Sequence, residues 1–302
     1  MTTRAREPRP RASGVAPLRT VTLITSRFDS IARHLNPRGL ARTLWRNRDL
    51  IRQFTRRDIE GRYRGSFLGI LWSFVNPLIL LAVYTLVFGV IFRGRWRQSQ
   101  SDGLGDFALA LFGGLIVINT FGECASRATG LIVSVPNYVK KVVFPLEILP
   151  VSVLGAALFH ALVSLIVLVL ANFVLTGAVH ATLLFLPLVW GPLVFLILGT
   201  TWFLASLGVF IRDIHYAVMM CTQVLPFVTP VFYPVSAVPE PFRTLVVLNP
   251  LTPVVENLRA IILWGLVPSF RALALSFLVS GLVMLVGYAW FMKTKKAFAD
   301  VL

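Results

Sequence analysis

Arginines that could bind an anionic group gather in one short stretch of this sequence. Residues 50–64 read LIRQFTRRDIEGRYR, and their candidate head-group residues are Arg56, Arg57, Arg62, Tyr63 and Arg64. Guanidinium groups form paired hydrogen bonds with phosphate oxygens, so these arginines could hold the phosphate groups of an anionic ligand. General attraction to the anionic lipids of a membrane surface explains the same arginines equally well.

Acid–base and nucleotide chemistry have little support in the sequence. Asp58 and Glu60 are the two acidic residues closest to each other, but they lie among arginines, where charge pairing explains them. A membrane glycosyl- or acyltransferase, the first alternative, would need such paired carboxylates. The chain has no GxxxxGK[ST] motif and no Gly-Lys dipeptide, so we expect it to bind no ATP itself. It also has no HExxH, GxSxG or paired cysteines, so we expect no metal site and no catalytic residue.

One further pair of opposite charges, Glu123 and Arg127, lies within the apolar residues 107–133. Charged side chains in a membrane helix face a partner or a water-filled space. Because these two are four residues apart, they can also satisfy each other on one helix. Both interpretations stay open at this stage.

The composition is that of an integral membrane protein. Of the 302 residues, 56% are hydrophobic and 14% are charged, and the mean hydropathy is +0.77. The net charge is +16, and residues 1–64, with sixteen arginines and five acidic residues, carry +11 of it. Basic residues just before a membrane span keep that flank in the cytoplasm, so the charge needs no nucleic-acid partner to explain it.

The basic stretch continues directly into the first span. Residues 40–65 place apolar side chains on one helical face and arginines mostly off it, as in a helix that lies in the lipid headgroup layer. The uncharged residues 67–92 are long enough to cross a bilayer. The junction contains three glycines spaced by four: Gly61, Gly65 and Gly69. This spacing predicts either a close helix contact or a flexible elbow.

Hydropathy predicts an all-α integral membrane fold with six transmembrane helices. The expected spans are residues 67–92, 107–133, 146–176, 183–211, 216–233 and 270–292 of a membrane domain at 66–292. Before the last span, residues 235–266 alternate prolines with apolar runs too short to cross, which predicts two short re-entrant helices on the outer side. Residues 1–39 are expected to be disordered and residues 293–302 to form a tail, with both termini in the cytoplasm.

Residues 135–144, between the second and third expected spans, combine apolar and basic side chains. A solvated loop needs no such apolar content, whereas a short helix that docks into a groove of a partner does. The candidate docking residues are Tyr138, Lys140, Lys141 and Phe144.

Four blocks of sequence, in this order, resemble a known family of membrane subunits. They are RRDIEGRYRGSFLGILWSFVNPL, KKVVFPLEILP, FIRDIHYAVMMCTQVLPFVTPVFYP and NPLTPVVENLRAIIL. The family is that of the polysaccharide-exporting ABC transporters, the Wzm-like permeases with the type-2 ABC exporter membrane domain. The resemblance extends from about residue 49 to the C-terminus, and residues 1–40 have no counterpart in it. The YTLVFGVIFRGRW ending of the first span is more similar to Gram-negative O-antigen and capsule exporters than to wall-teichoic-acid exporters.

The resemblance implies a transport subunit of the bacterial inner membrane, not an enzyme. Two copies of the chain would assemble with two separate ATPase subunits, which would bind the ATP and magnesium. Residues 40–65 would form a gate helix at the cytoplasmic surface, residues 135–144 the coupling helix and residues 235–266 the outer helices near the channel exit. The substrate would be a polysaccharide linked to undecaprenyl diphosphate.

Aromatic residues are the candidates for lining a path for sugars, because their faces stack on sugar rings. They are Trp72, Phe74, Tyr84, Phe227, Phe232 and Tyr233. Each of them, taken singly, is also explained as an ordinary lipid-facing or core residue. An exporter of a small molecule or drug with the same fold is the second alternative, because the sequence discriminates poorly between substrates.

Overall fold

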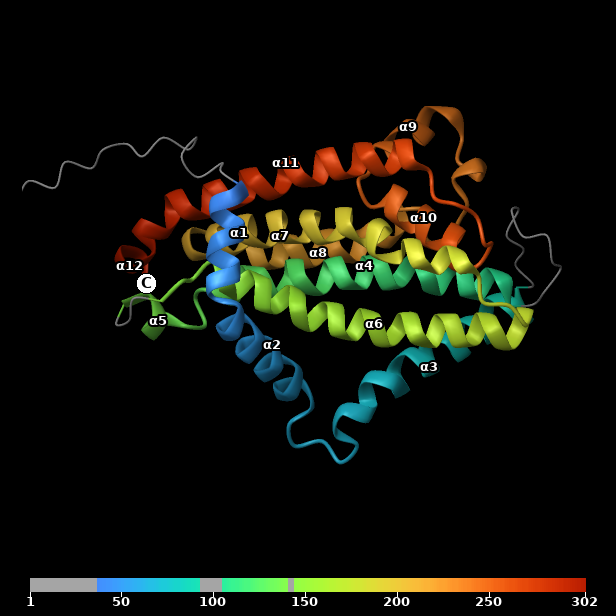
Figure 1. The fold of residues 1–302 in the computed structure, drawn as a ribbon, viewed down its shortest axis with the longest axis horizontal. Coiled ribbons are helices and arrows are strands. Elements are labelled where there is room, and N and C mark those ends of the chain that lie inside the picture. Colours follow the sequence, from blue (N-terminus) through green and yellow to red (C-terminus); the bar gives the residue numbers. More distant parts are fainter. Residues whose placement is uncertain (1–36, 93–104, 141–143) are drawn as a thin grey trace, which may run out of the picture.

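The computed structural model describes residues 37–92, 105–140 and 144–302. Every regular element in these residues is helical. The long helices run side by side, with α5, α12 and the C-terminus at one end of the bundle and α9 and α10 at the other (Figure 1). Lys141 and residues 1–36 lie outside the described ranges, so the expected disorder of the N-terminus stays a prediction.

The predicted amphipathic helix consists of two helices. α1 (Pro37–Arg46) and α2 (Arg48–Tyr63) meet at Asn47, whose side-chain amide donates a hydrogen bond to the Thr43 carbonyl at 2.9 Å. Phe54 on the apolar face of α2 is buried, and α2 packs along α6. The apolar face of α2 therefore covers the bundle, which accounts for the pattern without a lipid contact.

A tight turn at residues 64–68 separates α2 from the first span. Gly65 has a φ of 84° and Gly69 a φ of 52°, in the left-handed region that favours glycine. A side chain added to Gly61, Gly65 or Gly69 would meet no neighbouring atom within 4 Å. Within this chain the glycines form an elbow and do not form a close helix contact.

Five helices in the described residues are long and apolar enough to cross a membrane, and they agree with five of the expected spans. The first span, Gly69–Ile91, joins η2 (Gly69–Leu71), α3 (Trp72–Tyr84) and the π-helical η3 (Thr85–Ile91). The others are α4 (Asp106–Leu131), α6 (Ile148–Thr176), η4 (Ala181–Phe185) with α7 (Leu186–Phe210), and α11 (Phe270–Thr294) continuing through η6 (Lys295–Ala297) into α12 (Phe298–Val301).

The expected span at 216–233 is shorter than predicted. Its helix, α8 (Ile214–Val228), has 15 residues, fewer than the roughly 20 that cross a hydrocarbon core. Two short helices follow within residues 235–266, as expected: α9 (Glu240–Leu248) and α10 (Thr252–Ile262), bent by 85° to each other. Six full crossings are therefore not confirmed, and the depth of α9 and α10 in the membrane stays a prediction.

Helix α4 forms the centre of the bundle. It packs against α6, α7, α8 and α10, and most of its side chains are buried. Small residues such as Ala108, Ala110 and Gly113 let these neighbours approach closely. Because α4 is held on several sides, charged residues near its C-terminal half occupy fixed positions.

The contact between α7 and α11 supplies a test of this packing. A Cβ atom added to Gly287 would meet the backbone of Gly199, whereas one added to Gly281 would meet nothing within 4 Å. Gly287→Ala should therefore lower the free energy of unfolding by about 1–3 kcal/mol, as overpacking does. Thermal unfolding of the purified protein in detergent measures this effect. Gly281→Ala, six residues earlier, is the matched control, and an equal loss of stability in both variants would contradict the packing.

Candidate functional site

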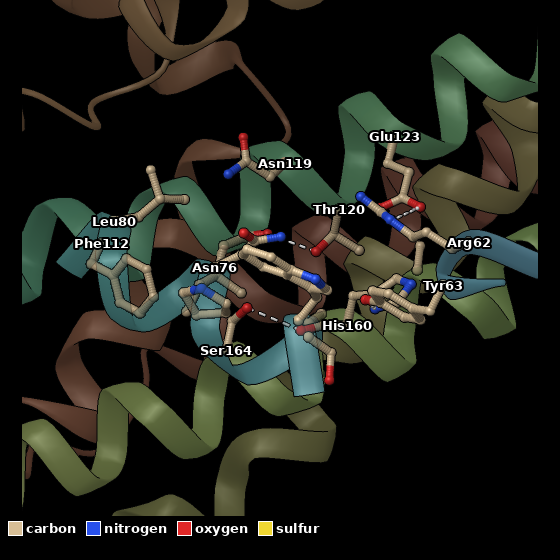
Figure 2. Close-up of a pocket in the computed structure, with 16 residues that line it drawn as sticks. Arg62, Tyr63, Asn76, Leu80, Phe112, Asn119, Thr120, Glu123, His160 and Ser164 are labelled. Carbon is tan, nitrogen blue, oxygen red and sulfur yellow. Dashed lines mark hydrogen bonds and ion pairs between the residues drawn. The ribbon is translucent and has the colours of Figure 1, made fainter. Parts of the chain in front are cut away.

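Four charged side chains connect α2 to α4. The Nη1 atom of Arg62 lies 2.7 Å from Oε1 of Glu123 (Figure 2), and Nη2 of Arg127 lies 2.8 Å from Oδ2 of Asp58. On each helix the acid and the base are four residues apart, so each acid faces a base of the other helix. We call these four residues the α2–α4 charge cluster.

The cluster changes the interpretation of the charges in the second span. The nearest charged atoms of Glu123 and Arg127 are 3.9 Å apart, so their contact with each other is the weaker one. Their close partners come from α2, which brings opposite charges to an otherwise apolar helix. Only 16% of the Asp58 side chain is exposed, and its carboxylate pairs with Arg127. This pairing explains Asp58 as a structural residue.

A cavity of about 150 Å³ lies beside the cluster, between α2, α3, α4 and α6. Its polar lining residues are Arg62, Tyr63, Trp72, Ser73, Asn76, Asn119, Thr120, Glu123, His160 and Ser164 (Figure 2). The Tyr63 hydroxyl forms a hydrogen bond with Nδ1 of His160 at 3.1 Å. Burial raises the pKa of Tyr63, so its hydroxyl stays protonated at neutral pH. The cavity is polar and has room for several water molecules.

The four candidate head-group arginines differ in how they are paired. Three face carboxylates: Arg56 with Glu60 at 2.6 Å, Arg57 with Asp58 at 4.0 Å and Arg62 with Glu123 at 2.7 Å. Arg64 follows the last residue of α2, is exposed, and pairs with no carboxylate in the described part of the chain. An anion can therefore reach Arg64 directly, whereas at Arg62 it must replace Glu123.

Three of the six candidate channel aromatics come together around Phe88. The ring centroid of Phe88 lies 6.4 Å from that of Tyr84 and 6.5 Å from that of Phe232, which stacks on Phe227 at 5.2 Å. The Tyr233 hydroxyl joins this group by donating a hydrogen bond to the Phe227 carbonyl at 2.7 Å. We call Tyr84, Phe88, Phe232 and Phe227 the aromatic row.

Trp72 and Phe74 lie outside the aromatic row. Trp72 lines the cavity beside the charge cluster, and Phe74 is exposed on α3. Phe88 is the member that the sequence analysis missed. Its position four residues after Tyr84, on the same helical face, is the signal that could have identified it.

The expected coupling helix is shorter than residues 135–144. The described helix there, α5 (Pro136–Lys140), has five residues. Tyr138 and Phe144 stack at 4.8 Å, and both rings contact Phe54 of α2, at 6.0 and 5.4 Å. Their apolar surface is used within this chain, so it gives no argument for a groove in a partner. Lys140 is exposed and remains available for docking to a partner.

A comparison with models of known protein families identifies the family of this chain. The model of the ABC-2 type transporter family matches residues 49–263. The chain belongs to the ABC-2 type transporter family. The matched range contains most of α2, the charge cluster, the cavity, the aromatic row and α10. The resemblance in the four sequence blocks is thereby confirmed.

Three relatives are similar over most of their length. The O-antigen export system permease protein RfbA of Myxococcus xanthus is 30% identical over 264 residues, which cover 86% of this chain and 98% of the relative. The protein of the same name from Klebsiella pneumoniae is 25% identical over 255 residues, 84% and 95% of the two chains. The polysialic acid transport protein KpsM of Escherichia coli is 23% identical over 248 residues, 80% and 92% of the two chains.

Within the ABC-2 range, Arg259 on α10 is a buried residue that the sequence analysis missed. Its guanidinium donates hydrogen bonds to the carbonyls of Ala110 at 2.8 Å, Pro230 at 2.7 Å and Val231 at 3.0 Å, and it pairs with Glu256 at 2.8 Å. Pro230 and Val231 lie in the segment that follows the end of α8. Arg259 therefore ties α10 to α4 and to this segment.

Replacing Arg259 tests this clamp. Arg259→Met leaves three buried carbonyls without their donor, which should lower the free energy of unfolding by about 2–5 kcal/mol. Thermal unfolding of the purified protein measures the loss. Arg271→Met, at the exposed start of α11, is the matched control and should change stability little. Equal stability of the two variants would show that the clamp contributes nothing.

Proposed function

We propose that this chain is the membrane-spanning subunit of an ATP-driven polysaccharide exporter. The substrate is a glycan of the O-antigen or capsule type, linked to undecaprenyl diphosphate, and it moves from the cytoplasm to the periplasm across the bacterial inner membrane. The observation that carries the proposal is similarity over at least 80% of the chain to relatives named for O-antigen export and polysialic acid transport. Those relatives have in common that their named cargo is a polysaccharide.

The substrate enters at α2. Arg64 is exposed at the end of this helix, and Arg62 lines the adjoining polar cavity. Guanidinium groups at a membrane surface bind the oxygens of a lipid diphosphate. The elbow at Gly65 and Gly69 lets α2 change its angle to the first span while the span stays in place.

The aromatic row serves the passage of the glycan. Tyr84, Phe88, Phe232 and Phe227 contact one another in succession, with ring centroids 5.2 to 6.5 Å apart, and join α3 and η3 to α8 and the segment after it. Stacking on sugar rings requires no particular sugar sequence, which suits the transport of a repeating polymer. The elements of the row lie toward the end of the bundle that carries α9 and α10, opposite to α5 (Figure 1).

Energy comes from a partner. Two copies of this chain bind two ATP-binding-cassette subunits, which hold ATP and magnesium and hydrolyse the nucleotide. The partner docks at the bundle end that carries α5, with the exposed Lys140, beside the C-terminus (Figure 1). Phe54 connects Tyr138 of α5 to α2, so a push on α5 moves the basic helix. Both termini are in the cytoplasm, and the positive-inside rule supports this orientation.

A genetic test separates the transport function from its rivals. Deleting the gene should abolish the surface polysaccharide, and the wild-type gene should restore it. Lys140→Glu should restore about tenfold less polysaccharide at equal membrane levels, because a reversed charge at a docking surface repels the partner. Immunoblotting of surface polysaccharide measures export, and the partner's ATPase rate measures coupling.

The control is Arg271→Glu, which makes the same charge change on an exposed residue at the start of α11 and should restore export fully. Intact surface polysaccharide after deletion of the gene would overturn the function. A deletion strain that keeps its surface polysaccharide but becomes sensitive to a small toxic compound would indicate a small-molecule exporter. Turnover of a glycosyl or acyl donor by the purified chain without nucleotide would indicate a transferase.

A further inference from the structure

A second hollow, open to solvent and about 600 Å³ in volume, adjoins the α2–α4 charge cluster. Its lining consists of five charged residues and one glycine: Arg57, Asp58, Gly61, Arg62, Glu123 and Arg127. Among the described residues, none with an apolar side chain lines it. We call this hollow the charge pocket.

The charge pocket has more bases than acids. Three guanidinium groups face two carboxylates, which leaves one positive charge uncompensated. Gly61 adds open space, since a Cβ atom built there meets no neighbour within 4 Å. Arg57 is held loosely, 4.0 Å from the Asp58 carboxylate and above the Phe54 ring. An anion that enters meets three arginines from two different helices.

The two carboxylates occupy the places where anion oxygens would bind. Glu123 lies 2.7 Å from Arg62 and Asp58 lies 2.8 Å from Arg127, the lengths of charge-assisted bonds between arginine and a phosphate oxygen. Each carboxylate comes from the helix opposite to its arginine. The same bonds therefore satisfy the arginines and fasten α2 to α4.

We propose that the charge pocket is a diphosphate-binding site, in which Glu123 and Asp58 occupy Arg62 and Arg127 until the ligand replaces them. The ligand class rests on the proposed function, because it is the diphosphate of the lipid-linked glycan. Binding breaks the two ion pairs between α2 and α4 and replaces them with a ligand bridge from Arg62 to Arg127, so the ligand changes how α2 is held against α4 while α2 stays packed along α6.

The exchange is feasible because the pairs are partly solvated. The Arg62 side chain is 50% exposed and that of Arg127 is 37% exposed, and ion pairs at such positions contribute little to stability. A diphosphate carries at least two negative charges and can bridge two guanidinium groups. The singly charged phosphate of an ordinary lipid can replace one carboxylate but not both. The pocket therefore distinguishes the diphosphate from bulk anionic lipid.

Occupancy of the charge pocket is transmitted to α5. Arg57 of the pocket lies 4.3 Å above the Phe54 ring, and Phe54 contacts Tyr138 of α5. A shift of α2 against α4 changes the support of α5, which is where the proposed ATPase partner docks. Substrate at the pocket is thereby coupled to the energy-supplying subunit.

Binding measurements on the purified full chain in detergent test the pocket. The probes are farnesyl diphosphate, farnesyl monophosphate and inorganic pyrophosphate, titrated by calorimetry. Glu123→Gln and Asp58→Asn should each tighten farnesyl diphosphate binding about fivefold, because each removes a competing carboxylate. Arg127→Gln should weaken it about tenfold. Glu60→Gln, which removes the partner of Arg56 outside the pocket, is the matched control and should leave the affinity unchanged.

Several outcomes decide the proposal. Equal affinities of the wild type, Glu123→Gln and Asp58→Asn, with thermal unfolding showing all of them folded, would overturn it. Farnesyl monophosphate binding as tightly as the diphosphate would also overturn it. The site is supported if the affinities of the variants for inorganic pyrophosphate fall in the same order as those for farnesyl diphosphate. Binding of farnesyl diphosphate that is tighter than that of inorganic pyrophosphate assigns the lipid as the source of the diphosphate.

The gene deletion keeps the two proposals distinguishable. If the deletion abolished the surface polysaccharide while Glu123→Gln and Asp58→Asn left the affinity for farnesyl diphosphate unchanged, only the charge-pocket proposal would be overturned. Intact surface polysaccharide together with the expected affinities would overturn the proposed function and leave a diphosphate site in a transporter of another substrate.

Discussion

Opposite charges shared between α2 and α4 are the interaction on which the arrangement at the first span depends. Glu123 and Arg127 lie in the second span, where an unpaired charge is costly, and α2 supplies Arg62 and Asp58 at 2.7 and 2.8 Å. Together with the packing of α2 along α6, this pairing holds the basic helix beside the cavity, and Phe54 of the same helix contacts Tyr138. The proposed anion site and its link to α5 rest on this arrangement.

The backbone does not fix α2 in the same way. The positive φ angles at Gly65 and Gly69 form an elbow, and the glycines pack against nothing within 4 Å. A helix attached through such an elbow is positioned by its side-chain contacts, so exchanging a few ionic contacts can move it. The opposite case is α10, which a fully buried arginine ties to α4 and to the segment after α8. The two helices are therefore held in different ways, α10 by a buried arginine and α2 by partly exposed ion pairs and its packing on α6.

Much of the fold could be predicted from the sequence because bilayer thickness sets the length of apolar runs. Five spans and the two short helices near residues 240–262 follow from that rule, and four sequence blocks indicated the family. Partners distant in sequence could not be predicted. Periodicity pairs Glu123 with Arg127, whereas the shorter bonds reach residues 61 and 69 positions away. The contact of Arg259 with the segment after α8 and the contacts of Phe54 with Tyr138 and Phe144 likewise join residues distant in sequence.

Hydrogen–deuterium exchange of the α2 amides tests the central claim most directly, because a free helix of 16 residues is only marginally stable in water. The account predicts that Arg62→Gln and Glu123→Gln each speed exchange across residues 48–63 about fivefold, while the double variant exchanges no faster than the single ones. Exchange of α2 that is the same in the wild type and all three variants would show that the charges do not hold the helix to α4.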